Sequence, residues 1–258
     1  MTKLSVNVNK IALLRNSRGT DHPNVERMAR RAITAGAHGI TVHPRPDQRH
    51  IRYGDVYELS GLVGSYDEVE FNVEGNPSRD FLRIVKEVRP DQCTLVPDDP
   101  DQLTSDHGWK LDADGERLPP VVEQLHAAGV RVSLFMDPDE AQLDRVAATG
   151  ADRIELYTEP YARAFGTEAE DAVWERYARA ATYAESLGLG VNAGHDLNLR
   201  NLPRFLTIPS ILEVSIGHAI VVDSFDHGFE GALARYLRIV SNAVESDPRA
   251  NPRGYREP

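Results

Sequence analysis

Cysteine is almost absent from this chain of 258 residues, which contains only Cys93. A single thiol excludes a disulfide framework, so we expect a protein of a reducing compartment, the cytoplasm. Long apolar runs are missing as well. None approaches the roughly 20 residues that span a bilayer, and the first residues lack the apolar segment of a signal peptide. We therefore expect no membrane partner.

Positive charge is also scarce. The chain has 29 Lys and Arg against 40 Asp and Glu, which gives a net charge of −11. A surface of that sign repels a polyanion, and this argues against nucleic acid as a partner. Small anions remain suitable ligands wherever arginines and helix N-termini gather.

The sequence does contain one arrangement four times: a helix pattern, a glycine and then a strand pattern. It occurs at Gly36, Gly129, Gly150 and Gly188, as in TAGAHGITVH and HAAGVRVSLF. Glycine just past a helix, followed by β-branched residues, is typical of the αβ connection in a repeated β/α unit. Reading outward from these points predicts strands at 4–8, 40–43, 69–74, 92–96, 132–135, 153–156, 190–193 and 212–216.

Helical patterns lie between most of these strands, at 24–35, 78–88, 120–128, 138–148, 168–187 and 228–243. The alternation predicts an α/β fold, a single-domain (β/α)₈ TIM barrel over 1–245. A doubly wound open sheet is the alternative, but it usually has a glycine-rich nucleotide turn after the first strand, and this sequence has none. The tail 246–258, with three prolines and no apolar pattern, is expected to be flexible or used in assembly.

The segment 97–118 interrupts this rhythm. It is acidic, rich in turn formers and longer than a βα connection needs to be. Loops of this length in compact domains are usually lids or binding loops, so we expect it to close over a bound ligand. His107 and Trp109 within it are expected to pack or to lie at the surface rather than to do chemistry.

The stretch GITVHPRPDQRHI places a short buried strand before His43 and then a loop that carries Arg45, Arg49 and His50. Two prolines stiffen this loop. Arg15 and Arg18 follow the first strand in a similar way. Arginines in such positions are either solvated surface charges or phosphate ligands, because the carboxyl ends of barrel strands are where sites are built.

Polar residues end most of the predicted strands, and in a barrel these ends converge on one mouth. Histidine and carboxylate side chains together indicate acid/base chemistry near neutral pH on an anionic small molecule. Glu74 ends the run EVEFNVE, where a buried carboxylate must be paired or functional. His43 has the alternative of a core histidine, and His195 that of a neighbour to a helix cap at Asp196. The strand-end residues are Asn7, Asn9, His43, Glu74, Asp137, Glu155, Asn192, His195, Gly217 and His218.

Eight segments follow one another along the chain: VNVNKIALLRNSRGT, GITVHPRPDQRHI, FNVE, LVP, VSLF, IELYT, VNAGHDLN and IGHAI. In these segments, and in their order, the chain resembles the pyridoxine 5′-phosphate synthase family of vitamin B6 biosynthesis. The resemblance runs from about residue 4 to about residue 238. It implies an enzyme that condenses 3-amino-2-oxopropyl phosphate with 1-deoxy-D-xylulose 5-phosphate, with no metal and no cofactor. It also implies a cytoplasmic homo-octamer with small phosphorylated molecules as substrates.

The resemblance also implies roles for single residues. His43 and Glu74 would accept protons, His195 would donate one, and Glu155 would stabilise charge. Asn7, Arg18, Asp196, Gly217 and His218 would bind the amino ketone phosphate. Asn9, Lys10, Arg45, His50 and Thr104 would bind the deoxyxylulose phosphate. The family usually has Asp-His where this chain has Asn9 and Lys10, and glycine where it has Asp196.

Two other functions remain open from the residues alone. One is a metal-dependent sugar-phosphate isomerase or epimerase on the same barrel, although the sequence shows no HxH or HExxH spacing. The other is a barrel that binds a phosphosugar without turning it over.

Overall fold

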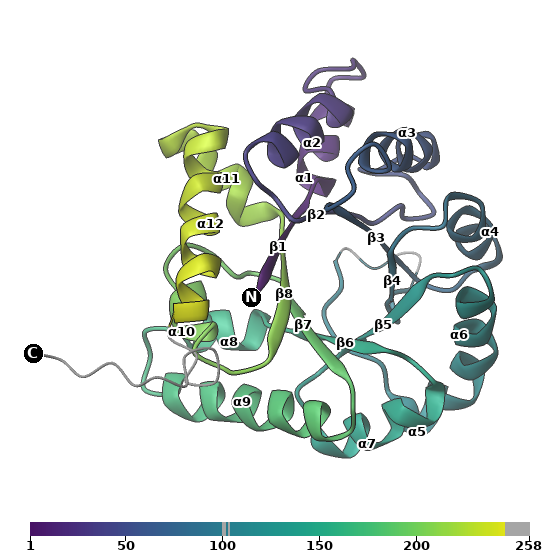
Figure 1. Cartoon of the computed structure of the whole chain (residues 1–258), viewed down its shortest axis with the longest axis vertical. Coiled ribbons are helices and arrows are strands. Elements are labelled where there is room, and N and C mark those ends of the chain that lie inside the picture. The colour runs from purple at the N-terminus through teal and green to yellow at the C-terminus, as the bar shows by residue number, and fades with distance from the viewer. Residues whose placement is uncertain (100–101, 103, 246–258) are drawn as a thin grey trace, which may run out of the picture.

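The computed structural model describes residues 1–99, 102 and 104–245. Its eight strands form a closed parallel barrel in sequence order, with helices around the outside (Figure 1). The predicted TIM barrel is confirmed, and each predicted strand agrees with the structure to within one residue at either end. The strands are β1 (Lys3–Asn7), β2 (Gly39–Val42), β3 (Glu70–Gly75), β4 (Gln92–Leu95), β5 (Arg131–Met136), β6 (Arg153–Tyr157), β7 (Gly190–Gly194) and β8 (Ile211–Ile216).

The six predicted helices are also found, with ends within two residues of the prediction. They are α2 (Val25–Thr34), α4 (Arg79–Val88), α6 (Leu118–Ala127), α7 (Glu140–Thr149), α9 (Glu170–Ser186) and α12 (Phe229–Glu245). The structure also contains elements that the sequence patterns did not predict: α1 (Asn9–Asn16), α3 (Tyr53–Val63), α5 (Leu111–Asp114), the 3₁₀ turn η1 (Gly115–Arg117), α8 (Glu159–Ala164), α10 (Leu202–Phe205) and α11 (His218–His227).

Local signals fix where the predicted helices begin and end. The Asn24 side chain accepts the Arg27 amide at 2.7 Å, which caps α2. Gly150 ends α7 at a φ of 81°, a left-handed conformation that glycine adopts without steric cost. Gly36, Gly129 and Gly188 also have positive φ, so the repeated glycine arrangement is what the structure uses to turn from helix to strand.

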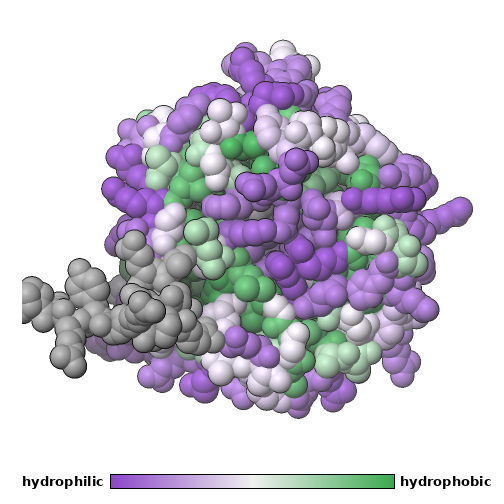
Figure 2. All heavy atoms as spheres, viewed as in Figure 1, coloured by the Kyte–Doolittle hydropathy of each residue, from purple (hydrophilic) through white to green (hydrophobic). Residues whose placement is uncertain are grey.

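The apolar core lies outside the barrel, between the strands and the helices. Along β3, Phe71 and Val73 point outward into this core, while Asn72 and Glu74 alternate with them toward the barrel interior. The interior is polar: Thr94 donates to Asn72 at 3.1 Å. Figure 2 likewise shows hydrophilic residues at the centre of the face it displays, with hydrophobic atoms around them. A polar interior can accommodate carboxyl groups at the mouth.

The second half of the segment 97–118 is largely helical. It contains α5 and η1, and Trp109 is a core residue whose indole donates to the Leu95 carbonyl at 2.8 Å. Residues 100, 101 and 103 of this segment and the tail 246–258 lie outside the described residues, so the predicted lid and the predicted flexible tail stay predictions. Among the described residues, no helix is long and apolar enough to cross a membrane.

Candidate active site

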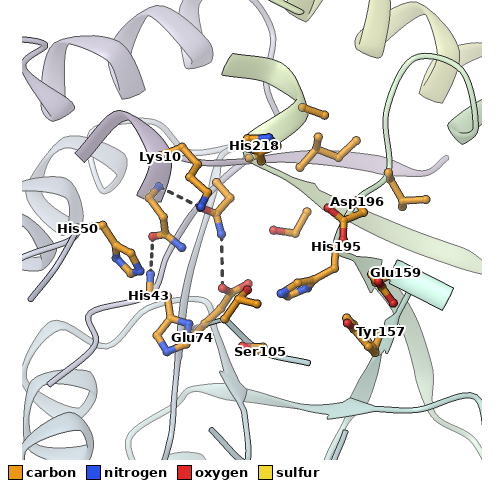
Figure 3. A pocket seen from close by; sticks show the side chains of 18 of the residues that line it. Lys10, His43, His50, Glu74, Ser105, Tyr157, Glu159, His195, Asp196 and His218 are labelled. Atoms are coloured by element: carbon orange, nitrogen blue, oxygen red, sulfur yellow. Dashed lines mark hydrogen bonds between the residues drawn. The ribbon is translucent and has the colours of Figure 1, made fainter. Parts of the chain in front are cut away.

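A cavity of about 610 Å³ opens at the carboxyl ends of the strands. Side chains from four strands and from the loops after them point into it (Figure 3). The structure brings together the predicted site residues Asn7, Asn9, Lys10, His43, Arg45, His50, Glu74, Thr104, Glu155, His195, Asp196, Gly217 and His218.

A chain of hydrogen bonds links the ends of β1, β2 and β3. Asn7 donates to Glu74 at 3.4 Å and accepts the Asn9 amide at 3.0 Å. The Asn9 side-chain oxygen in turn accepts the backbone amide of His43 at 2.9 Å. Figure 3 shows these bonds as dashed lines. Three strands that meet only in the folded barrel are therefore held in one register at the mouth.

Two carboxyl groups share the floor of the cavity. Glu74 and Glu155 are both buried, and burial is the main cause that raises the pKa of each, to about 8 for Glu155. Each group also feels another carboxyl: Glu155 raises the pKa of Glu74, and Glu213 raises that of Glu155. An acid with a pKa near the working pH can both take up and release a proton, which suits general acid/base catalysis.

Three of the histidines that line the same cavity have lowered pKa values. Burial lowers the pKa of His43 well below its usual value, with help from the charge of Arg45, and it lowers the pKa of His50 to about 4. The Nδ1 atom of His50 accepts the Ile51 amide at 2.9 Å, so its Nε2 atom carries the proton of the neutral ring. His195 packs against the rings of Phe135 and Tyr157, and burial lowers its pKa too.

The amino end of α11 reaches the cavity after β8. Gly217 precedes this ten-residue helix and provides no side-chain cap. A Cβ atom at Gly217 would lie 2.9 Å from the Asn7 carbonyl oxygen, so only glycine fits here without displacing β1. Uncapped amide groups at a helix N-terminus form a ready anion site.

The arginines considered as phosphate ligands differ in their position relative to the cavity. Arg45 lines the cavity but also pairs with buried Asp98 and donates to the Gln102 carbonyl at 3.0 Å. Arg15 lies in the interior, where its guanidinium binds Asp55 at 2.6 and 2.8 Å, so the interpretation of Arg15 as a phosphate ligand is wrong. Arg18 is exposed and is not among the residues that line the cavity.

Three further expectations need correction. Asn192 lies below the mouth, where it donates to Gln92 at 3.3 Å, and Asp137 pairs with Lys110 away from the cavity. The idea that Asp196 caps a helix is wrong, because α10 begins only at Leu202. Asp196 instead has a positive φ of 58°.

The cavity wall also contains residues that were not predicted from the sequence, among them Tyr157, Ser105, Asp106, Glu159 and Arg163. Tyr157 could have been predicted from the sequence, because it lies two residues after Glu155 on the same strand and therefore on the same face of it. The others depend on where α8 and the segment after β4 fold back over the mouth. Among the described residues, no group of three metal-binding side chains is arranged to hold a metal ion.

Buried acids and bases around a cavity with an anion-binding helix end are typical of a (β/α)₈ enzyme of acid/base chemistry. Comparison with known proteins shows to which family within this class of enzymes the chain belongs. The family described as "Pyridoxal phosphate biosynthesis protein PdxJ" matches residues 4–242, and the chain belongs to this family.

Named relatives agree with this assignment. The chain is 50% identical over 246 residues to pyridoxine 5′-phosphate synthase of Albidiferax ferrireducens, which covers 93% of this chain and 98% of the relative. It is 52% identical over 237 residues to the protein of the same name from Porphyromonas gingivalis, with 92% and 98% covered. The solved Amycolatopsis orientalis BexX/CysO complex contains a chain with a TM-score of 0.63 at 15% identity, covering 100% of this chain and 94% of that one; this likeness shows the fold alone.

Proposed function

We propose that the chain is a pyridoxine 5′-phosphate synthase. It condenses 3-amino-2-oxopropyl phosphate with 1-deoxy-D-xylulose 5-phosphate and releases phosphate and water. The observation that carries this conclusion is the identity of about half of all residues over more than nine-tenths of both chains. The cavity supports it, because its acids, bases and anion-binding groups meet the needs of this reaction.

Three residues transfer protons in this proposal, and a fourth stabilises charge. An amine must attack a ketone, water and phosphate must leave, and a carbon–carbon bond must close the ring, so protons are removed and delivered repeatedly. His43 and Glu74 accept protons, and Glu155 beside Glu74 stabilises charge at the reaction centre. The raised pKa of Glu74 makes its carboxylate a stronger base than an exposed one.

His195 is the proton donor in this proposal. Burial lowers its pKa in the unliganded site, while Asp196 acts in the opposite direction. Two substrate phosphates add negative charge to the cavity, which raises the pKa of an imidazole. Substrate binding therefore shifts the pKa of His195 upward and favours the protonated ring that a donor requires.

The two phosphates occupy opposite sides of the cavity. Asn7, Asp196, Gly217 and His218 serve the amino ketone phosphate, with the start of α11 supplying amide groups. Arg18, which the family resemblance assigns to the same phosphate, is exposed and does not line the cavity in this structure. The deoxyxylulose phosphate is bound by Asn9, Lys10, Arg45, His50 and Thr104. His50 contributes the N–H of a neutral ring, and Lys10 and Arg45 contribute positive charge.

Lys10 provides a specific test of this arrangement. Its ammonium lies in the cavity where the family usually has histidine, and a lysine is a suitable point charge for a phosphate oxygen (Figure 3). We expect Lys10→Ala to raise KM for the deoxyxylulose phosphate several-fold, with KM for the amino ketone phosphate little changed. Steady-state kinetics with each substrate varied in turn gives the answer. Equal KM values in variant and parent would mean that Lys10 extends into solvent without touching the substrate.

Turnover separates this function from the two alternatives. The purified protein, given both phosphates in the presence of a chelator, is expected to form pyridoxine 5′-phosphate. A metal-dependent isomerase would instead lose its activity to the chelator and would need one sugar phosphate only. A binding-only barrel would bind the phosphates without product.

The family resemblance extends to a cytoplasmic homo-octamer. A surface suited to self-association is available where α1 and α11 lie side by side (Figure 1). It exposes Leu13, Leu14, Val222 and Phe225, the last with 80% of its area accessible. Light scattering of the purified protein tests the assembly, and the expected mass is eight times the chain mass of 28.7 kDa.

A further inference from the structure

The turn that presents His195 to the cavity has an unfavourable backbone. His195 has a φ of 81° and Asp196 a φ of 58°, two successive left-handed residues without a glycine. Such a conformation is unfavourable for an L-amino acid, because it brings the Cβ atom close to the following carbonyl oxygen. The turn persists only because its surroundings hold it.

Side chains bind each carbonyl of this turn. Buried Thr158 donates its hydroxyl hydrogen to the Gly194 carbonyl at 2.6 Å and also approaches the His195 carbonyl. The third carbonyl, that of Asp196, accepts from Asn201 at 3.1 Å and from Asn198 at 3.3 Å. The backbone amide of Thr158 donates to Gly194 as well, at 3.0 Å.

Thr158 directly precedes α8, a position where threonine ordinarily caps the helix with its own hydroxyl. Here the hydroxyl makes no cap bond to α8 and reaches across to the end of β7 instead. It therefore connects the strand that carries Glu155 to the turn that carries His195. The Thr158 hydroxyl thus bonds the end of β7 and not the amide groups of the first turn of α8.

We propose that Thr158 is a positioning residue, whose buried hydroxyl holds the strained 194–196 turn so that the His195 imidazole faces the substrates. The proposal rests on the proposed function, in which His195 donates a proton. Loss of the hydroxyl lets the turn relax and moves the ring, and a misplacement of about 1 Å can cost up to 10²-fold in rate.

Three variants test the proposal. Thr158→Val keeps the shape without the hydroxyl, and Thr158→Ser keeps the hydroxyl. Thr149→Val is a matched control, because Thr149 is also buried and its hydroxyl bonds the Val146 carbonyl at 2.7 Å, away from the cavity. If Thr158→Val does not fold, Thr158→Ala replaces it under the same criteria.

We expect kcat of Thr158→Val to fall about tenfold, the lower part of the range for a misplaced group. KM for the deoxyxylulose phosphate, which binds on the β1 and β2 side, should stay within about twofold of the parent because the turn does not reach that side. Thr158→Ser should recover most of kcat, and Thr149→Val should resemble the parent. An unchanged kcat in Thr158→Val, or an equal loss in the valine and serine variants with both KM values raised, would overturn the proposal.

Hydrogen exchange tests the same role without depending on turnover. The amides of 194–197, measured without substrate, should exchange at least about tenfold faster in Thr158→Val than in the parent or in Thr149→Val, as expected when a local opening becomes easier. Equal exchange in all three proteins would refute the positioning role. A parent protein that forms no product would refute the proposed function instead.

Discussion

Replacing Glu74 with glutamine is expected to lower kcat by about 10²-fold or more, the scale of a lost general base. Glutamine has nearly the same shape and can still accept the hydrogen bond from Asn7, so both KM values should change little. What it lacks is the ability to take a proton. Steady-state kinetics and a melting curve of the folded variant provide the measurement.

The same variant should become more stable than the parent at alkaline pH. Burial raises the pKa of Glu74 in the folded state, so the unfolded chain releases this proton at lower pH than the folded chain does. Glu74 therefore makes its full contribution to the free energy of unfolding below the pKa of an unfolded glutamate, about 4.3. That contribution is lost as the pH rises through the pKa of Glu74 in the folded protein. Glutamine never ionises, so the Tm of Glu74→Gln should exceed that of the parent at pH 8 but not at pH 4.

Glu213→Gln is the control for this experiment. Glu213 is also buried, with a pKa raised to about 7, but it does not line the cavity. Its glutamine variant should show the same change of Tm with pH. It should keep most of its turnover, because Glu213 acts on the site only by raising the pKa of Glu155 and Glu74 and touches no substrate. Turnover of Glu74→Gln equal to that of the parent would remove Glu74 from the chemistry.

Gly194→Ala is expected to lower kcat nearly as much as Glu74→Gln does, although it removes no reactive group. A Cβ atom at this position would lie 2.3 Å from Oε1 of Glu155, which is buried and must move. Displacement of a group at the reaction centre by about 1 Å can cost about 10²-fold in kcat. Overpacking should also lower the free energy of unfolding by about 1–3 kcal/mol.

A glycine outside the site provides the comparison. Gly54 in α3 has open space where an added Cβ atom would lie, with no other atom within 4 Å, and its φ is not positive. Gly54→Ala should therefore leave kcat unchanged and stabilise the helix slightly, by about 0.5–1 kcal/mol. If kcat of Gly194→Ala also matched the parent, the position of Glu155 would not matter for turnover.

The barrel could be predicted because its signals are local. Each predicted strand begins close after a helix end or turn, and runs such as ITV and RVSLF are recognisable from β-branched and apolar residues. The helices that were missed lack such signals. α3 contains two glycines and a serine, and only Val8 separates the end of β1 from the start of α1.

The candidate site was predicted less evenly, because contacts across strands are not written in the local sequence. Strand-end position and family resemblance indicated Glu74, Glu155 and His195. Neither could show that Arg15 binds Asp55 in the interior or that Thr158 bonds the turn beside His195. These pairs are 40 and 36 residues apart in the chain and meet only when neighbouring β/α units pack.

The most direct test of the assigned function is a stoichiometric assay of the purified protein with both substrates and a chelator, in which pyridoxine 5′-phosphate and inorganic phosphate are measured together. Two phosphate groups enter the reaction and one remains in the product. We therefore predict one phosphate released for each pyridoxine 5′-phosphate formed, and no product when either substrate is left out. Bound substrates without pyridoxine 5′-phosphate, or an isomerised sugar phosphate as the product of one substrate alone, would contradict the assignment.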